Sequence, residues 1–222
     1  MSSEQEVNIQ GGSWASNHEF PFMVSLRKSN TMSHFCGGTL ISKRHILSAS
    51  HCAVDTNALS VSATFGFNKL TDCVANGFMT DTKTISIEST CIKAKIKKIT
   101  IHPEYDDTTI ANDIAIFELY DDIPFGDTIK PLCVNKVTPS IGSTHLIAGW
   151  GTTSSSNTAS NQLVKAYVPL VDIKYCNDLG LGLPPKDLCA GAGKGVDACA
   201  GDSGGPLAIY LNQTWFQSGV TR

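Results

Sequence analysis

The sequence lacks any run of about 18 apolar residues, the length that a membrane-spanning helix needs. Charge is also scarce, because 17% of the residues are charged, the formal net charge is −3 and the isoelectric point is near 6.0. These absences remove the apolar and electrostatic signals that would indicate a membrane or a nucleic acid as a partner. We therefore expect neither.

The cysteines lack the Cys-x-x-Cys spacing that is typical of zinc sites, although the chain contains 8 of them. Cysteines in such number without that spacing favour disulfides, and hence an oxidising compartment. The glycosylation sequon Asn212-Gln213-Thr214 agrees with this. The first residues, Met1 to Glu6, have neither the charged nor the apolar region of a signal peptide. We predict a secreted protein whose signal peptide is not present in this chain.

Long helical periodicity is missing as well, and short alternating segments replace it. A chain of 222 residues, 41% of them hydrophobic, can bury the core of one domain or of two small ones. β-branched, alternating segments bounded by turns predict an all-β fold, with strands at 23–27, 35–42, 61–67, 95–101, 113–119, 144–148, 162–170 and 206–211. One short helix is predicted between Val171 and Leu179, with Asp172 as its N-cap and Gly180 ending it.

Two further segments have ordinary structural explanations. The stretch from Gly151 to Asn161 is dense in Ser and Thr, which predicts an exposed loop. The lysines between Lys93 and Lys98 partly alternate with apolar residues, which favours the solvent-facing side of a strand over an anion site.

The segment Gly201-Asp202-Ser203-Gly204-Gly205-Pro206 places one serine among small residues whose amides can approach its hydroxyl. Serine needs a base to remove its proton, and the oxyanion that it creates must be held by N–H donors. The chain offers His51 beside Cys52 after a short strand, and Asp113 at the start of an apolar strand. Taken alone, the glycine-rich segment could be a turn, His51 could be a half-buried histidine, and Asp113 could be a charge at the edge of a strand. Their joint occurrence indicates acyl transfer.

One competing catalytic motif fits the same serine. Gly201-Asp202-Ser203-Gly204-Gly205 also matches the Gly-x-Ser-x-Gly nucleophile elbow of α/β-hydrolases, a fold that places its aspartate and histidine after the serine. Only 19 residues follow Ser203, and none of them is a histidine. The order of the residues therefore excludes the elbow.

With these motifs in the order His, Asp, Ser, the chain resembles the chymotrypsin/trypsin family of serine proteases from about Ile9 to Val220. The resemblance implies two Greek-key β-barrels, at 9–125 and 136–222, which follow a propeptide-like segment at 1–8. It also implies that Ser203 is the nucleophile, that His51 is the base, and that Asp113 orients His51. The N–H groups of Gly201 and Ser203 would bind the oxyanion. No metal or organic cofactor is expected.

The resemblance extends to substrate choice. Asp197 lies six residues before Ser203, where trypsin-like enzymes carry the carboxylate at the base of the primary pocket, which implies cleavage after Lys or Arg. An exposed loop aspartate is the alternative.

The resemblance also implies an activation step. The segment Ile9-Gln10-Gly11-Gly12 resembles the family's activation junction, so cleavage before Ile9 would free an ammonium group that pairs with Asp202. Asn8 departs from the usual Arg or Lys before that bond, and Gln10 from the usual valine. A Gly-Gly turn with no role in processing is the alternative.

Two disulfides are implied by the resemblance, Cys36 with Cys52 and Cys176 with Cys189. Cys73 and Cys91 can close the loop between them with a bridge of their own. Cys133 and Cys199 are left over, because in relatives their partners lie in a propeptide or farther along the chain.

Relatives in the family continue past the point that corresponds to Arg222, so we expect an incomplete second barrel and little turnover by residues 1–222. The sequence as a whole predicts a serine endopeptidase in zymogen form, with polypeptide substrates and protein protease inhibitors as partners. A non-catalytic homologue that acts as a binding module is the alternative, although no triad residue is replaced. A structural β-domain would leave the intact triad unexplained.

Overall fold

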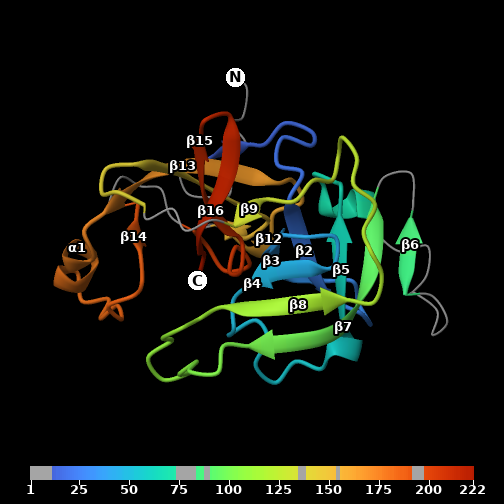
Figure 1. Cartoon of the computed structure of the whole chain (residues 1–222), viewed down its shortest axis with the longest axis horizontal. Helices are drawn as coiled ribbons and strands as arrows, with labels where there is room; N and C mark the ends of the chain where they lie inside the picture. The colour runs from blue at the N-terminus through green and yellow to red at the C-terminus, as the bar shows by residue number, and fades with distance from the viewer. Residues whose placement is uncertain (1–11, 74–83, 88–90, 135–138, 154–155, 192–197) are drawn as a thin grey trace.

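The computed structural model describes residues 12–73, 84–87, 91–134, 139–153, 156–191 and 198–222 (Figure 1). The described chain is nearly all β, as predicted. Two sheets account for most of its strands, and Figure 1 shows them with the short helix α1 at one side of the second sheet.

Six strands close into the first barrel, in the order β5-β2-β3-β4-β8-β7. Pairing between β5 and β7 completes the barrel, with Ser62 opposite Lys95. The bounds of these strands are β2 (Met23–Lys28), β3 (His34–Leu40), β4 (His45–Ser48), β5 (Val61–Phe65), β7 (Ile92–Ile101) and β8 (Ala115–Leu119). The short strand β6 (Ile85–Ile87) pairs antiparallel with β7. Along the chain, the 3₁₀ helix η1 (Ala58–Ser60) precedes β5 and the 3₁₀ helix η2 (Leu70–Cys73) follows it. Closure pairs every strand of the barrel on both sides.

The second sheet has the order β1-β13-β10-β15-β16-β9, with β14 paired to β13. Its strands are β1 (Ser13–Trp14), β9 (Cys133–Val134), β10 (Thr144–Gly149), β13 (Val164–Val171), β14 (Cys189–Ala190), β15 (Pro206–Leu211) and β16 (Thr214–Val220). β1 precedes the first barrel in the chain yet pairs with β13, and β9 follows the barrel and pairs in parallel with β16. The chain therefore pairs with the second sheet both just before it enters the first barrel and just after it leaves it.

An aromatic cluster fills the space between the two sheets. Trp150 is fully buried, and its ring stacks on Phe67 at 5.2 Å between centroids. Its indole N–H donates to the Asn68 carbonyl at 2.8 Å, which satisfies the polar atom of an otherwise apolar contact. Phe20 and Phe22 belong to the same buried cluster. Side chains from the first barrel and from the second sheet therefore pack in one shared hydrophobic core.

The helix is confirmed, and it begins where its cap predicts. α1 covers Ile173–Asp178, and the Asp172 carboxylate accepts the N–H of Lys174 at 2.9 Å. Gly180, just past the helix, has a φ of +84°, which glycine adopts without the strain that a side chain would bring. All eight predicted strands are present, with ends that shift by a few residues.

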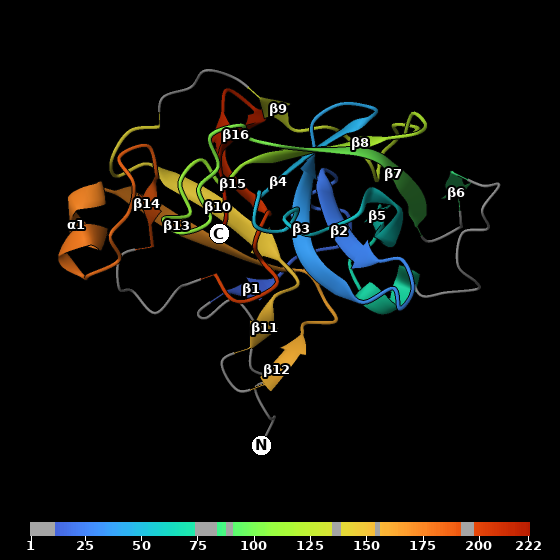
Figure 2. The ribbon, with the colours of Figure 1, turned by 90° about the horizontal axis from the view of Figure 1, so that it is seen from below.

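Two local predictions were wrong. The segment predicted as a loop from Gly151 to Asn161 contains a hairpin of β11 (Thr152–Thr153) and β12 (Ser156–Ala159), which projects from the body in Figure 2. Lys93 was predicted to face solvent but is only 2% exposed, because β5 and β6 both pair with this end of β7 and cover it. Lys97 and Lys98 are exposed as predicted.

Three disulfides cross-link the chain, Cys36–Cys52, Cys73–Cys91 and Cys176–Cys189. The first and the third are the pairs that the resemblance implied, and the second is the bridge that Cys73 and Cys91 were expected to be able to form. Cys133 and Cys199 lie outside these three bridges.

Candidate active site

His51 and Asp113 meet at one end of the first barrel. They follow β4 and precede β8, and these antiparallel strands pair with Ser48 opposite Ala115. His51 Nδ1 lies 2.7 Å from Asp113 Oδ2, and the His51 backbone N–H donates to Asp113 Oδ1 at 2.8 Å. The Asp113 side chain is 6% exposed and the His51 side chain is 31% exposed. The carboxylate is therefore enclosed, whereas the ring reaches solvent.

The environment keeps Asp113 ionised. Burial raises the pKa of its carboxyl group. Hydrogen bonds from the His51 ring and from the His51 N–H lower this pKa, and together the lowering influences outweigh burial, so that the pKa lies below its ordinary value. An ionised carboxylate can only accept, so the proton on the His51 ring sits on Nδ1. Nε2 then has a lone pair that is available to take a proton.

Ser203 shares a cavity with His51. The cavity has a volume of about 910 Å³, and its wall includes the Cys36–Cys52 disulfide and Phe35 from the first barrel. Gly201 and Ser203 complete the wall from the loop before β15. The structure thus brings His51 and Asp113 into direct contact and places Ser203 on the same cavity as the histidine.

The loop from Cys199 to Ser203 is fastened through every one of its carbonyl groups. The acceptors are the carbonyls of Cys199, Ala200, Gly201, Asp202 and Ser203, and their donors are Asp202 N, Thr152 N, His34 Nε2, Gly205 N and Gly37 N, at 2.7 to 2.9 Å. Among the described residues, no acceptor faces the backbone N–H of Gly201 or of Ser203. These are the two donors that the sequence predicted for an oxyanion.

Asp202 is buried directly beside the predicted nucleophile. The residue is 2% exposed, and its carboxylate accepts the N–H of Gly151 at 2.8 Å and the N–H of Cys199 at 2.9 Å. Burial raises its pKa to about 6, although both hydrogen bonds oppose the rise. Two glycines make room for it, since a Cβ on Gly149 or Gly151 would lie 2.1 or 2.4 Å from its oxygens. Within the described parts of the chain, no cation forms an ion pair with this buried carboxylate.

Asp197 and Ile9 lie outside the described residues, so the pocket base and the activation pair stay predictions. Sequence reasoning missed His34, whose ring contacts the Gly201 carbonyl. Its only signal in the sequence was its position two residues before Cys36. Within the described residues, one cluster of metal-ligating atoms is present, formed by Cys36, His51 and Cys52, but its two sulfurs are joined in a disulfide and offer no thiolate.

The comparison with known proteins agrees with this geometry. A sequence model of the family described as Trypsin matches residues 9–221. The chain belongs to the trypsin family. The prediction of the family from the three motifs is therefore confirmed, and so is the trypsin-like all-β fold.

Two trypsin-family relatives show how much of the chain is shared. Transmembrane protease serine 9 of Rattus norvegicus is 35% identical over 205 residues, and Trypsin 5G1 of Aedes aegypti is 34% identical over 205 residues. Each match covers 90% of this chain, but 18% of the rat protein and 70% of the mosquito protein. The chain thus spans less than a fifth of the rat relative. None of the described helices is both long and apolar enough to cross a bilayer.

Proposed function

We propose that this chain carries the catalytic residues of a serine endopeptidase, which hydrolyses peptide bonds through an acyl-enzyme on Ser203. The observation that carries the proposal is the His51–Asp113 pair, because His51 lines the same cavity as Ser203. A weak nucleophile beside an oriented base is the arrangement that acyl transfer requires.

The mechanism follows from the donors and acceptors. Ser203 Oγ attacks the substrate carbonyl carbon while His51 Nε2 takes its proton. The ring is then a cation, and the Asp113 carboxylate at 2.7 Å stabilises it. His51 returns the proton to the leaving amine, which releases the C-terminal product. Water then attacks the ester by the same route, and the Ser203 hydroxyl is regenerated.

The oxyanion formed in both steps would be held by the N–H groups of Gly201 and Ser203. Support comes from the loop around them, where each carbonyl from Cys199 to Ser203 has a donor while these two N–H groups have no acceptor among the described residues. Donors that are fixed in advance stabilise developing charge without reorganisation, and losing one costs about 10²–10³ in kcat.

Substrate choice and activation complete the proposal. Asp197 would pair with a Lys or Arg side chain before the scissile bond. Cleavage before Ile9 would supply an ammonium group to Asp202, whose raised pKa reflects burial without sufficient compensating charge. The three disulfides agree with an oxidising, extracellular location. The enzyme would therefore be secreted as a zymogen.

A fluorophosphonate probe tests the proposal directly, because it reacts with a serine only when a base and an oxyanion site assist. The chain is produced with a removable leader so that Ile9 becomes the N-terminus, and labelling is located by peptide mass mapping. We expect one label, on Ser203, and none in Ser203→Ala or His51→Ala. Labelling of another residue, or no labelling of the folded wild-type chain, would overturn the proposal.

A further inference from the structure

The turn that joins β15 to β16 consists of two exposed residues, Asn212 and Gln213. Leu211 stands opposite Thr214 at the last pair of the ladder, so the chain reverses within these two positions. Their φ angles are +48° and +62°, and the type I′ turn, whose twist suits a hairpin, requires positive φ at both central residues. Asparagine enters this region at less cost than most side chains. The fold therefore holds Asn212 in solvent at the tip of the hairpin.

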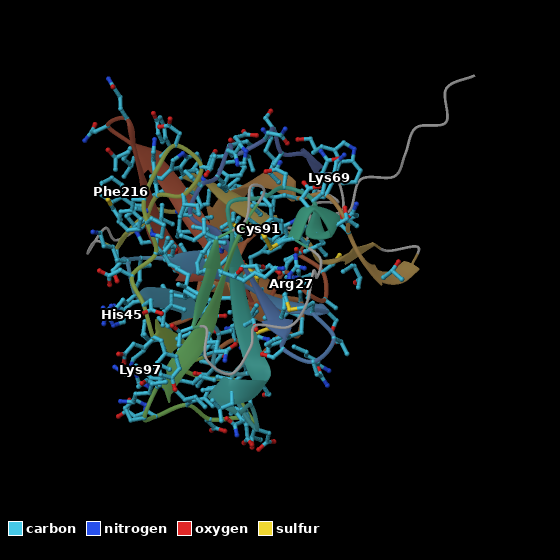
Figure 3. The ribbon with its side chains drawn as sticks, turned by 90° about the vertical axis from the view of Figure 1, so that its right-hand side faces the viewer. Arg27, His45, Lys69, Cys91, Lys97 and Phe216 are labelled. Carbon is cyan, nitrogen blue, oxygen red and sulfur yellow. A yellow bond between two sulfur atoms is a disulfide. The ribbon has the colours of Figure 1, made fainter. Side chains whose placement is uncertain are left out.

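The hairpin tip lies far from the candidate active site. β15 starts at Pro206, shortly after Ser203, and runs for 6 residues, so its far end is roughly 20 Å along the strand at about 3.4 Å per residue. Figure 1 shows the turn between β15 and β16 at the top of the molecule, and Figure 3 shows Phe216 of β16 at the edge, whereas Arg27 lies within the body. The described wall of the cavity that His51 and Ser203 share contains no residue of this hairpin. A bulky group at the tip would therefore leave the cavity open.

Asn212 is the one asparagine of the sequence that is followed, two positions later, by a serine or threonine with no proline between them. This pattern is the acceptor for N-linked glycosylation in secreted proteins. The turn is an independent observation, because a sequon inside a buried strand would leave no room for a sugar, whereas this one is exposed. We propose that Asn212 carries an N-linked glycan, and that its first N-acetylglucosamine rests on the side chain of Leu211.

The modification is a group transfer from a lipid-diphosphate-linked oligosaccharide. Asn212 Nδ2 forms a bond to C1 of the first N-acetylglucosamine, while the bond from C1 to the diphosphate oxygen breaks. One proton leaves Nδ2, and the lipid diphosphate departs as the leaving group. No oxidant or reductant is consumed. The transferring enzyme reads the hydroxyl group of the sequon, here that of Thr214.

The two faces of the hairpin differ next to the turn. Leu211 pairs with Thr214 and Tyr210 pairs with Trp215, and successive residues of a strand point to opposite faces. On one face the Tyr210 and Trp215 rings already contact each other, with their centroids 5.0 Å apart. On the other face Leu211 is 37% exposed. Leu211 is therefore the apolar side chain next to Asn212 that a sugar can still cover.

Contact between the sugar and Leu211 should stabilise the hairpin. One face of an N-acetylglucosamine ring presents C–H groups, so the contact removes apolar surface of both partners from water. Asn212 directly follows Leu211, and the turn already fixes the backbone between them, which lowers the entropy lost in making the contact. The contact also holds the tip of the β15–β16 ladder closed. The glycan should therefore raise the thermal stability of the chain and leave its chemistry unchanged.

Occupancy of Asn212 is measured by mass spectrometry. The chain is produced in eukaryotic cells behind a cleavable signal peptide and recovered from both cells and medium, and loss of the signal peptide shows that it has entered the secretory compartment. Enzymatic release of N-glycans in H₂¹⁸O converts a glycan-bearing asparagine to ¹⁸O-labelled aspartate, which peptide mass mapping locates. We expect the label at position 212 in more than about half of the chains. It should be retained in Thr214→Ser and absent in Thr214→Ala.

A thermodynamic cycle tests the contact with Leu211. Removing the glycan from the folded wild type should lower Tm by about 2 °C or more, and the loss should fall to less than about half of this in Leu211→Ser. Tyr210→Ser, on the opposite face of the same hairpin, is the matched control and should keep the full loss. The aspartate that glycan removal leaves is common to all three chains, so its effect cancels in the comparison.

Trimming the glycan to its first N-acetylglucosamine should keep the Tm of the full glycan, and nuclear Overhauser effects should connect that sugar with the Leu211 methyl groups. The Overhauser measurement needs no variant, so it decides the question even if Leu211→Ser fails to fold. An unmodified Asn212 in chains that have lost the signal peptide would overturn the glycosylation site. A first sugar without Overhauser effects to Leu211, or an equal Tm loss in Leu211→Ser and wild type, would overturn the contact.

Discussion

The backbone N–H of Gly37, on β3 of the first barrel, donates to the carbonyl oxygen of Ser203 at 2.7 Å. His51 belongs to the same barrel, and the Cys36–Cys52 disulfide joins the residues next to Gly37 and to His51. The adjacent residues Cys36 and Gly37 are therefore linked to both sides of the site, Cys36 to the residue after His51 and Gly37 to Ser203. This contact joins the loop that carries Ser203 to the barrel that carries His51.

Gly37→Ala should disturb that contact. A Cβ at this position would lie 3.0 Å from Gly205 N and 3.1 Å from Gly205 Cα, so the backbone after Ser203 must shift by a few tenths of an ångström. We expect kcat to fall about 10-fold, because small misplacements of reacting groups are costly. Gly126→Ala is the control, since nothing lies within 4 Å of a Cβ there. Equal kcat in both variants would show that the contact does not position Ser203.

Asp113→Asn tests the orientation of the base. The amide would present a donor to His51 Nδ1, which favours the tautomer with its proton on Nε2 and removes the lone pair that takes the Ser203 proton. We expect kcat to fall about 10⁴-fold with a smaller change in KM. Asp122→Asn, which removes an exposed pair with Arg44, should leave both constants unchanged. A loss of less than 10-fold in Asp113→Asn would mean that His51 does not depend on this carboxylate.

Asp202 predicts how stability depends on pH. Its pKa is about 6 in the folded chain and ordinarily 3.8, so folding favours its protonated form. The stabilisation is complete below about pH 4 and is lost as pH rises through 6, a loss of roughly 3 kcal/mol. Chemical denaturation from pH 4 to 7 should show this loss in the chain that starts at Met1, relative to Asp202→Asn.

Freeing Ile9 by cleavage should reverse the effect, because its ammonium group would favour the ionised carboxylate. The processed chain is then expected to gain stability over the same pH range. If processed and unprocessed chains gave identical pH profiles, Ile9 would not pair with Asp202, and the proposed activation would be wrong.

The sequence was most informative where a pattern is local. Strand alternation located the long strands, and one capping aspartate located α1. β1 and β9 have two residues each, which is too short for alternation to be visible. Lys93 was misplaced because alternation reports which face a residue takes, but not that another strand covers that face.

The residues of the site also differ in whether a local sequence pattern identifies them. Ser203, His51 and Asp113 stand in distinctive local sequences, so they could be named as candidates before the fold was known. The contact between His34 and Gly201 depends on side-chain direction across 167 positions, and no periodicity encodes it. Polar contacts of this kind arise from tertiary packing and are found only in the structure.

Asp197 should bind the cationic side chain of the substrate residue before the scissile bond. Peptides that differ only in arginine or citrulline at that position have nearly the same shape, so the ratio of their kcat/KM values isolates the charge. The wild type should prefer arginine by about 100-fold or more, since the neutral substrate would leave a carboxylate at the pocket base without a partner. Asp197→Ser should bring the ratio close to one, while Asp178→Ser, on the exposed α1, should keep the preference. A preference for arginine that survives in Asp197→Ser would assign the pocket charge to another residue.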